Sequence, residues 1–115
     1  AMLEQMKQLL KAAGLTVYDS VEKVGECRAP YVVCYDNGTE VQPGTKGMFG
    51  RHLYEVMCLT PYAQVAALAA LEKQVREVLK AVQGLRFSGS TGTGAEPNYK
   101  ARAISLTYAE MERLG

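Results

Sequence analysis

Apolar and polar residues recur along this chain with two periods, one typical of helices and one of strands. Within residues 3–13 the apolar positions are spaced by three and four, and they are Leu3, Met6, Leu10 and Ala13. This spacing predicts an amphipathic helix, and Gly14 is a natural stop because glycine adopts left-handed backbone angles freely. Residues 15–17 are expected to pair briefly as a strand, and residues 19–26 to form a polar connector.

Two segments then have the composition of strands. Residues 31–35 follow Pro30 and are rich in β-branched and aromatic side chains, and Asp36-Asn37-Gly38 predicts a turn after them. Residues 51–60 predict a longer strand with two largely apolar faces. Such a strand either buries its second face against a partner subunit or lies in the centre of the sheet.

A helix signal follows the second strand. Thr60-Pro61 predicts a helix start, with threonine as the cap and proline at the first helical position. The helix should run to about residue 82, because apolar residues recur at spacings of three and four, namely Leu68, Leu71, Val75, Val78 or Leu79, and Val82. Gly84 predicts its end, and residues 85–88 and 101–109 predict two more strands.

The order of elements is therefore α-β-β-α-β-β. It predicts one α+β domain over residues 1–115, with a four-stranded, mostly antiparallel sheet and both helices packed on one face. Ala1, before Met2, is interpreted as a cloning remnant. The candidate core residues are the apolar positions of these elements, namely Leu10, Val33, Tyr54, Val56, Leu68, Leu71, Val75, Leu79, Ile104 and Leu106.

Two predicted loops, residues 36–50 and 88–99, are longer than common hairpin loops and rich in glycine. Long loops in compact domains tend to be binding elements or disordered segments, so we expect both to be mobile in the isolated protein. The candidate protein-interaction residues lie in or beside them, and they are Met48, Phe49, Arg51, Tyr99, Lys100 and Arg102.

Composition excludes several classes of protein. The chain has 13 Lys and Arg against 12 Asp and Glu, so it lacks the strong positive charge of general nucleic-acid binders. The longest apolar stretch, residues 65–71, is too short to span a bilayer, so we expect no membrane contact and a cytoplasmic origin. Three cysteines without a CxxC pair favour reduced, buried thiols over disulfides.

Candidate chemistry is sparse. His52 could form a dyad or a zinc site with Cys27, Cys34 and Cys58, but the ligand spacing fits no known finger, and a partly exposed strand histidine is the preferred interpretation. The glycine run in 88–94 lacks the lysine and following helix of a phosphate loop, which favours a flexible hairpin tip. We therefore predict no catalytic residue, no metal, no cofactor and no small-molecule substrate.

Basic residues flank the last predicted hairpin. Arg86, Lys100 and Arg102, with Phe87 and Tyr99, could form a small nucleic-acid platform. Ordinary edge-strand charge, which discourages aggregation, is the preferred interpretation because no RNP-like aromatic pattern accompanies it. A small α+β binding module acting on nucleic acid remains the alternative function, and an enzyme comes third.

The element order and one short line of residues carry a resemblance to a known family. The line is a helix ending Ala13-Gly14, then Val17-Tyr18-Asp19, then Pro30-Tyr31-Val32-Val33. With the α-β-β-α-β-β order, it resembles the tail terminator or tail-completion proteins of long-tailed bacteriophages and prophages, also called minor capsid or minor tail proteins. The resemblance covers nearly the whole chain and concerns the fold more than an activity.

The resemblance implies a non-enzymatic structural protein of the virion. Members of the family form a ring, commonly a hexamer, that caps the completed tail tube and offers a surface to the head-side connector. The implied partners are other copies of the chain, the tail-tube protein and the connector protein. The implied location is the virion tail, and the host bacterial cytoplasm during assembly. Exposed strand edges and an apolar second sheet face are features that suit such a ring.

Overall fold

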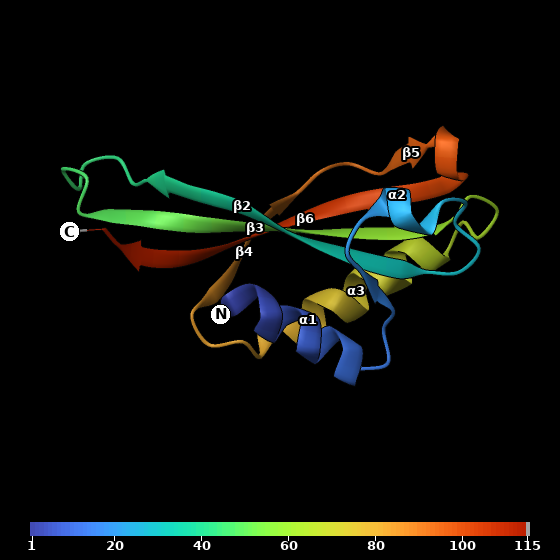
Figure 1. Ribbon diagram of the computed structural model, residues 1–115, viewed down its shortest axis with the longest axis horizontal. Helices are drawn as coiled ribbons and strands as arrows, with labels where there is room; N and C mark the ends of the chain where they lie inside the picture. The colour runs from blue at the N-terminus through green and yellow to red at the C-terminus, as the bar shows by residue number, and fades with distance from the viewer. Residues whose placement is uncertain (115) are drawn as a thin grey trace.

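The computed structural model describes residues 1–114, which form one open, mixed sheet with helices on it (Figure 1). The six strands are β1 (Val17–Tyr18), β2 (Tyr31–Val41), β3 (Phe49–Pro61), β4 (Leu85–Ser90), β5 (Gly94–Glu96) and β6 (Ala101–Arg113). Their order is β1-β2-β3-β6-β4, and β5 pairs with β6 beside the β4 position. All pairs are antiparallel except that of β1 with β2.

The α+β class is confirmed, and the four-stranded sheet is corrected to six strands. The two additional strands are short segments at one end of the long strands, where Val17 pairs with Val32 and Ala95 pairs with Arg102. The brief pairing expected at residues 15–17 is found at Val17–Tyr18, whereas β5 escaped the sequence pattern because three residues show no periodicity of their own. Both short strands pair only because long neighbouring strands offer free backbone groups.

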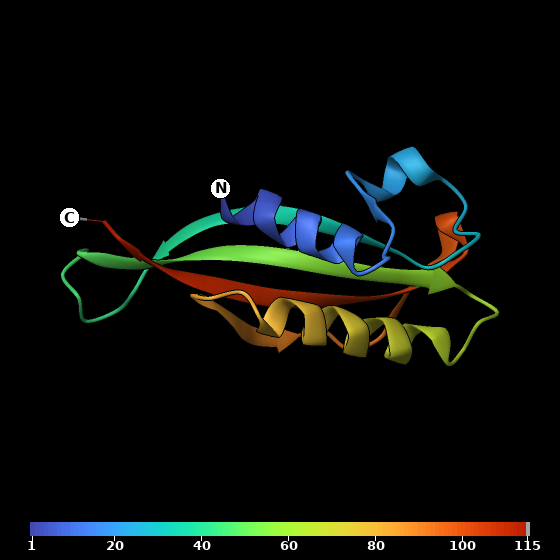
Figure 2. The same ribbon diagram turned by 90° about the horizontal axis from the view of Figure 1, so that it is seen from below.

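The helices α1 (Met2–Ala12) and α3 (Ala67–Lys80) pack side by side on one face of the sheet (Figures 1 and 2). Gly14, at φ +89°, follows α1, and the Leu15 N–H closes the turn onto the Leu10 carbonyl. Apolar residues of both helices pack against Val56 and Leu106 of the sheet. All ten candidate core residues are buried, although Val33 belongs to a second cluster on the opposite face.

The opposite face is covered at one end only. The short helix α2 (Val21–Val24) and the 3-10 helix η1 (Pro97–Tyr99) pack there over Tyr31, Val33 and Leu59. The predicted polar connector at 19–26 therefore contains a helical turn, which Ser20 caps by accepting a hydrogen bond from the Lys23 N–H. The chain itself thus covers part of the apolar second face of β3, which is a central strand.

The predicted helix start at Thr60-Pro61 is wrong. Both residues continue β3, opposite Arg102 and Ala101 of β6, and α3 begins only at Ala67. Thr60 is fully buried in the sheet. A threonine-proline pair suits a helix start locally, but here the long ladder with β6 extends the strand through it.

The strands also run further than the sequence predicted, so the loops are shorter. β2 passes through Asp36-Asn37-Gly38 with a bulge and continues to Val41, and β6 continues to Arg113. The expected long loop at 36–50 is therefore wrong, because only residues 42–48 turn between β2 and β3. Residues 88–99 likewise include the end of β4, all of β5 and η1.

Candidate interaction surface on a projecting arm

The far ends of β2, β3 and β6 project beyond the helices as a three-stranded ribbon (Figures 1 and 2). We call residues 36–53 and 109–114 the arm. The protein measures 48 × 27 × 23 Å, and the arm forms one end of its long axis. The helices cover neither face of the arm, so its side chains are available to other molecules.

The tip of the arm exposes a group of large apolar side chains. They come from both strands of the β2–β3 hairpin and from the end of β6, and they are Val41, Met48, Phe49, Met111 and Leu114. The Leu114 N–H donates to the Met48 carbonyl at 2.7 Å, which ties the end of β6 to the hairpin turn. The strand register places Val41 and Leu114 on one face of the ribbon and Phe49 and Met111 on the other, so the tip exposes apolar side chains on both faces. Exposed apolar side chains concentrated at one end of a molecule are typical of a surface for another macromolecule.

Three of the six candidate interaction residues lie in the arm. Met48 and Phe49 belong to the apolar tip. Arg51 lies two residues after Phe49 on β3, where its guanidinium forms an ion pair with Glu40 on β2. Arg51 therefore fixes β2 to β3 as well as carrying charge.

The other three candidates lie at the opposite end of the sheet. Lys100, in a left-handed conformation, pairs with Glu26 at 3.6 Å. Arg102 donates from Nε to the Tyr62 carbonyl and lies over the Tyr62 ring. Tyr99 packs in the second apolar cluster. The structure thus separates the six residues into two sites and does not bring them together.

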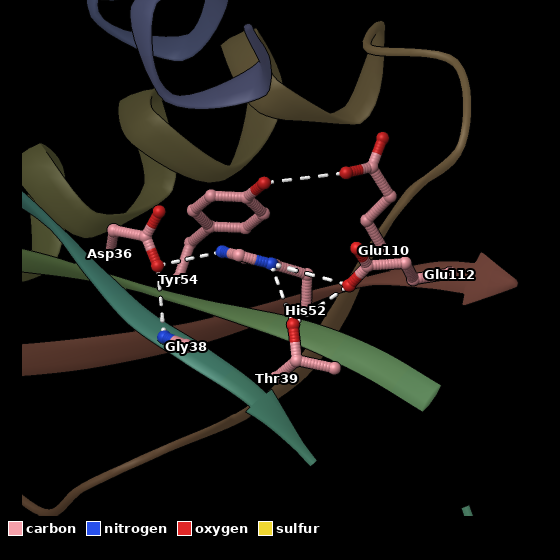
Figure 3. Close-up of polar contacts among 7 residues, drawn as sticks. All are labelled: Asp36, Gly38, Thr39, His52, Tyr54, Glu110 and Glu112. Carbon is pink, nitrogen blue, oxygen red and sulfur yellow. Dashed lines mark hydrogen bonds and ion pairs between the residues drawn. The ribbon is translucent and has the colours of Figure 1, made fainter. Parts of the chain in front are cut away.

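A network of polar side chains centred on His52 joins the three strands at the root of the arm (Figure 3). His52 Nε2 lies 2.6 Å from Asp36 Oδ1 on β2, and Nδ1 lies 2.9 Å from Thr39 Oγ1. The Thr39 hydroxyl donates to Glu112 Oε2 on β6 at 2.7 Å, and that carboxylate is also 3.5 Å from His52 Nδ1. We call Asp36, Thr39, His52 and Glu112 the clasp.

The clasp favours a charged histidine. Because the Thr39 hydroxyl donates to Glu112, its oxygen is left to accept a hydrogen bond, so both ring nitrogens of His52 face acceptors. Partial burial lowers the pKa of His52, but the bonds to Asp36 and Glu112 outweigh this effect, and the net pKa is raised. The Gly38 N–H and then His52 lower the pKa of Asp36.

An aromatic residue, Tyr54, and an acidic one, Glu110, lie next to the clasp. The Tyr54 ring lies 4.8 Å from the His52 ring, centroid to centroid, and its hydroxyl donates to Glu110 Oε1 at 3.3 Å (Figure 3). Burial, followed by the charge of Glu110, raises the pKa of Tyr54 to about 12, so this hydroxyl stays protonated. Tyr54 therefore joins the clasp to the buried core.

A hydroxyl, an imidazole and a carboxylate in line invite comparison with a catalytic triad. In a triad the hydroxyl gives its proton to the imidazole, whereas the Thr39 hydroxyl gives its hydrogen bond to Glu112. The clasp is built to hold strands together through charged hydrogen bonds.

The cysteines lie apart from His52. Cys34 and Cys58 are in the main core and Cys27 is in the second cluster. Burial raises the pKa of the Cys34 thiol to about 11 and that of Cys58 to about 12, which keeps both thiols protonated. Within residues 1–114 no group of His, Cys, Asp and Glu has the arrangement of a metal site.

Sequence reasoning missed the clasp. Its members are far apart in the chain, and Asp36 and Thr39 were assigned to a turn and a loop. The available signal was the polar spacing of Glu110 and Glu112 at the end of the last strand, which places both carboxylates on the face that His52 and Tyr54 share.

The comparisons with known proteins leave the family undecided. No family model matches the chain, and no curated protein matches it. Among the described residues, none of the helices has the length and apolar character needed to cross a membrane.

Proposed function

We propose that this protein is a structural component of a phage virion, a tail terminator whose copies form a ring on the end of the tail tube. The observation that supports this most is the arm, because it exposes apolar side chains at the end of a hydrogen-bonded three-stranded ribbon. An exposed apolar surface at one end of an elongated subunit suits permanent contact with another protein.

The family resemblance supplies the specific part of the proposal. It implies the ring, commonly a hexamer, and the partners, which are the tail-tube protein and the head-side connector. On this proposal the protein acts in the virion tail after assembly in the host cytoplasm. The arm tip and the opposite end, with Lys100 and Arg102, would then face different partners, because they lie at the two ends of the long axis.

The alternative function, nucleic-acid binding through the last hairpin, has less support. Of its three basic residues, Lys100 is paired with Glu26 and Arg102 is stacked on Tyr62. Arg86 lies on β4, opposite Ala109, several residues along β6 from Arg102. The three cations therefore do not line one groove, as a strand of nucleic acid would require.

The direct test uses the protein together with the tail-tube protein encoded beside it in the same phage genome. We expect light scattering to show a ring at high protein concentration, and electron microscopy to show tubes of limited length capped at one end. The variant Phe49→Ser, which alters the exposed arm tip, should weaken tube binding, while Val65→Ser, which replaces an exposed apolar residue outside the arm, should not. Tubes that grow unchanged beside the wild-type protein would reject the proposed function.

A further inference from the structure

The two open edges of this sheet are the outer sides of β4 and β2. They lie on opposite sides of the molecule and at the same level, that is, at the same position along the strand direction. The outer side of β4 pairs with no strand among residues 1–114, and β1 covers the outer side of β2 only at Val32 and Val33. Two rows of paired residues cross the sheet from β4 to β2: Phe87, Tyr108, Tyr54 and Asp36, and then Ser90, Leu106, Val56 and Cys34. β4 is therefore level with the part of β2 that β1 leaves open.

The strand directions fit as well as the level. Each step from β2 to β3, β6 and β4 is antiparallel, so β2 and β4 run in opposite directions. If a second copy is placed beside the first with its sheet the same way up, its β2 meets β4 in antiparallel orientation. Such head-to-tail contacts close into a ring when the copies are related by rotation, and edges at one level need no rise between copies.

Each edge also carries one bulge close to the row through Phe87, Tyr108, Tyr54 and Asp36. The bulge of β2, between Asp36 and Thr39, and that of β4, between Phe87 and Gly89, lie on opposite sides of this row. The exposed Arg86 on β4 makes no ion pair within residues 1–114. The open part of β2 carries the carboxylate of Glu40 on the same face of the sheet as Arg86, and this carboxylate also pairs with Arg51 of its own copy.

We propose that β4 of one copy pairs with residues 34–41 of β2 in the next copy, so that one continuous antiparallel sheet runs around the ring. This inference rests on the proposed ring and assigns the strands that build it. The occupant of each edge is a second copy of this chain, because the two edges lie at one level and run in opposite directions, with Arg86 and Glu40 on the same face of the sheet. α1 and α3 of all copies then lie on one side of the continuous sheet.

A cysteine pair tests this contact directly. Asn37 and Ser88 are exposed bulge residues of the two edges. Within one chain three strand spacings separate them, about 14 Å, which is too far for a disulfide. We expect Asn37→Cys with Ser88→Cys to give, on mild oxidation, a covalent ladder ending at the ring size. The matched pair Gln64→Cys with Ser88→Cys, with Gln64 exposed beyond β3, should give no ladder.

A charge reversal gives a second readout. Arg86→Glu should raise the protein concentration for half-assembly roughly tenfold, because like charges then meet across the contact. Lys11→Glu, the same charge change on an exposed site of α1, should leave assembly unchanged. Equal effects of the two variants, or a ring without a ladder, would overturn the edge contact and leave the proposed function standing. No ring with or without the tail-tube protein would overturn both.

Discussion

The three long strands pass through two regions that are held together in different ways. At one end α1 and α3 cover one face and α2 with η1 covers the other, and residues 31–34 of β2 are all buried. In the arm the same strands have no cover, and residues 36 and 39–41 of β2 are exposed. Burial therefore stabilises the covered end, whereas paired polar side chains across the strands hold the arm.

This difference separates stability from interaction. The cross-strand pairs of the arm are Arg51 with Glu40, His52 with Asp36, and Thr39 with Glu112. Each such pair on a sheet contributes only a modest free energy of folding. These pairs join the strands of the arm without using its apolar tip, which stays free for another protein. Changes at the covered end should alter folding, and changes in the arm should alter assembly.

The largest effect is expected from truncating a buried residue of the covered end. Leu79 is fully buried between α3 and the sheet, and Leu79→Ala should lower the free energy of unfolding by about 2–5 kcal/mol, because a cavity remains. Urea unfolding followed by circular dichroism measures this loss. Met111→Ala in the arm, where the side chain is 56% exposed, should change the same quantity by less than about 0.5 kcal/mol. Similar losses of unfolding free energy in Leu79→Ala and Met111→Ala would contradict the idea that burial stabilises only the covered end.

A methyl group added at Gly50 should damage the arm alone. A Cβ at this position would lie 2.7 Å from the Glu40 carbonyl oxygen and 2.9 Å from Leu114 Cδ1. We expect Gly50→Ala to cost about 1–3 kcal/mol, as overpacking does, and to speed amide exchange in residues 39–53. Gly92→Ala, with no atom within 4 Å of the added Cβ, is the matched control. Faster exchange in α3 would show that the arm and the covered end unfold together.

The same division explains what the sequence could predict. The spacing of Leu68, Leu71, Val75 and Leu79 follows from burial on one helix face, so it identified α3 and its core positions. Gly14 was equally readable because its left-handed backbone angle is a local requirement. Where burial or a local backbone angle decides the structure, the pattern is visible along the chain.

The arm could not be predicted because it depends on pairing between distant segments. Residues 36–41 contain Asp, Asn and Gly, which favour turns locally, yet the backbone of β3 pairs with them through a bulge. The Thr60-Pro61 error has the same cause. The six candidate interaction residues were chosen in or beside two predicted loops, and only the strand lengths decide that these segments lie at opposite ends of the molecule.

The smallest effect is expected from the clasp, and it depends on pH. The pKa of His52 is raised above 6.5 in the folded protein, so its contribution is complete below pH 6.5 and is lost as pH rises through the raised value. The pKa of Asp36 is lowered below 3.8, so its contribution is present above pH 3.8 and is lost as pH falls through the lowered value. The clasp should therefore stabilise the arm most between pH 3.8 and 6.5.

The clasp should contribute about 0.2–1 kcal/mol to the stability of the arm, as other solvent-accessible ion pairs do, and salt should reduce this contribution. NMR titration of the His52 ring should show a midpoint above 6.5 that falls in Asp36→Asn, because the variant removes the carboxylate from Nε2. Amide exchange in the arm should be faster at pH 8 than at pH 6 after correction for the intrinsic rate. In His52→Gln this pH difference should vanish, since glutamine bridges the strands without titrating. An unchanged midpoint in Asp36→Asn would mean that the arm is held by its backbone ladder and the Arg51–Glu40 pair alone.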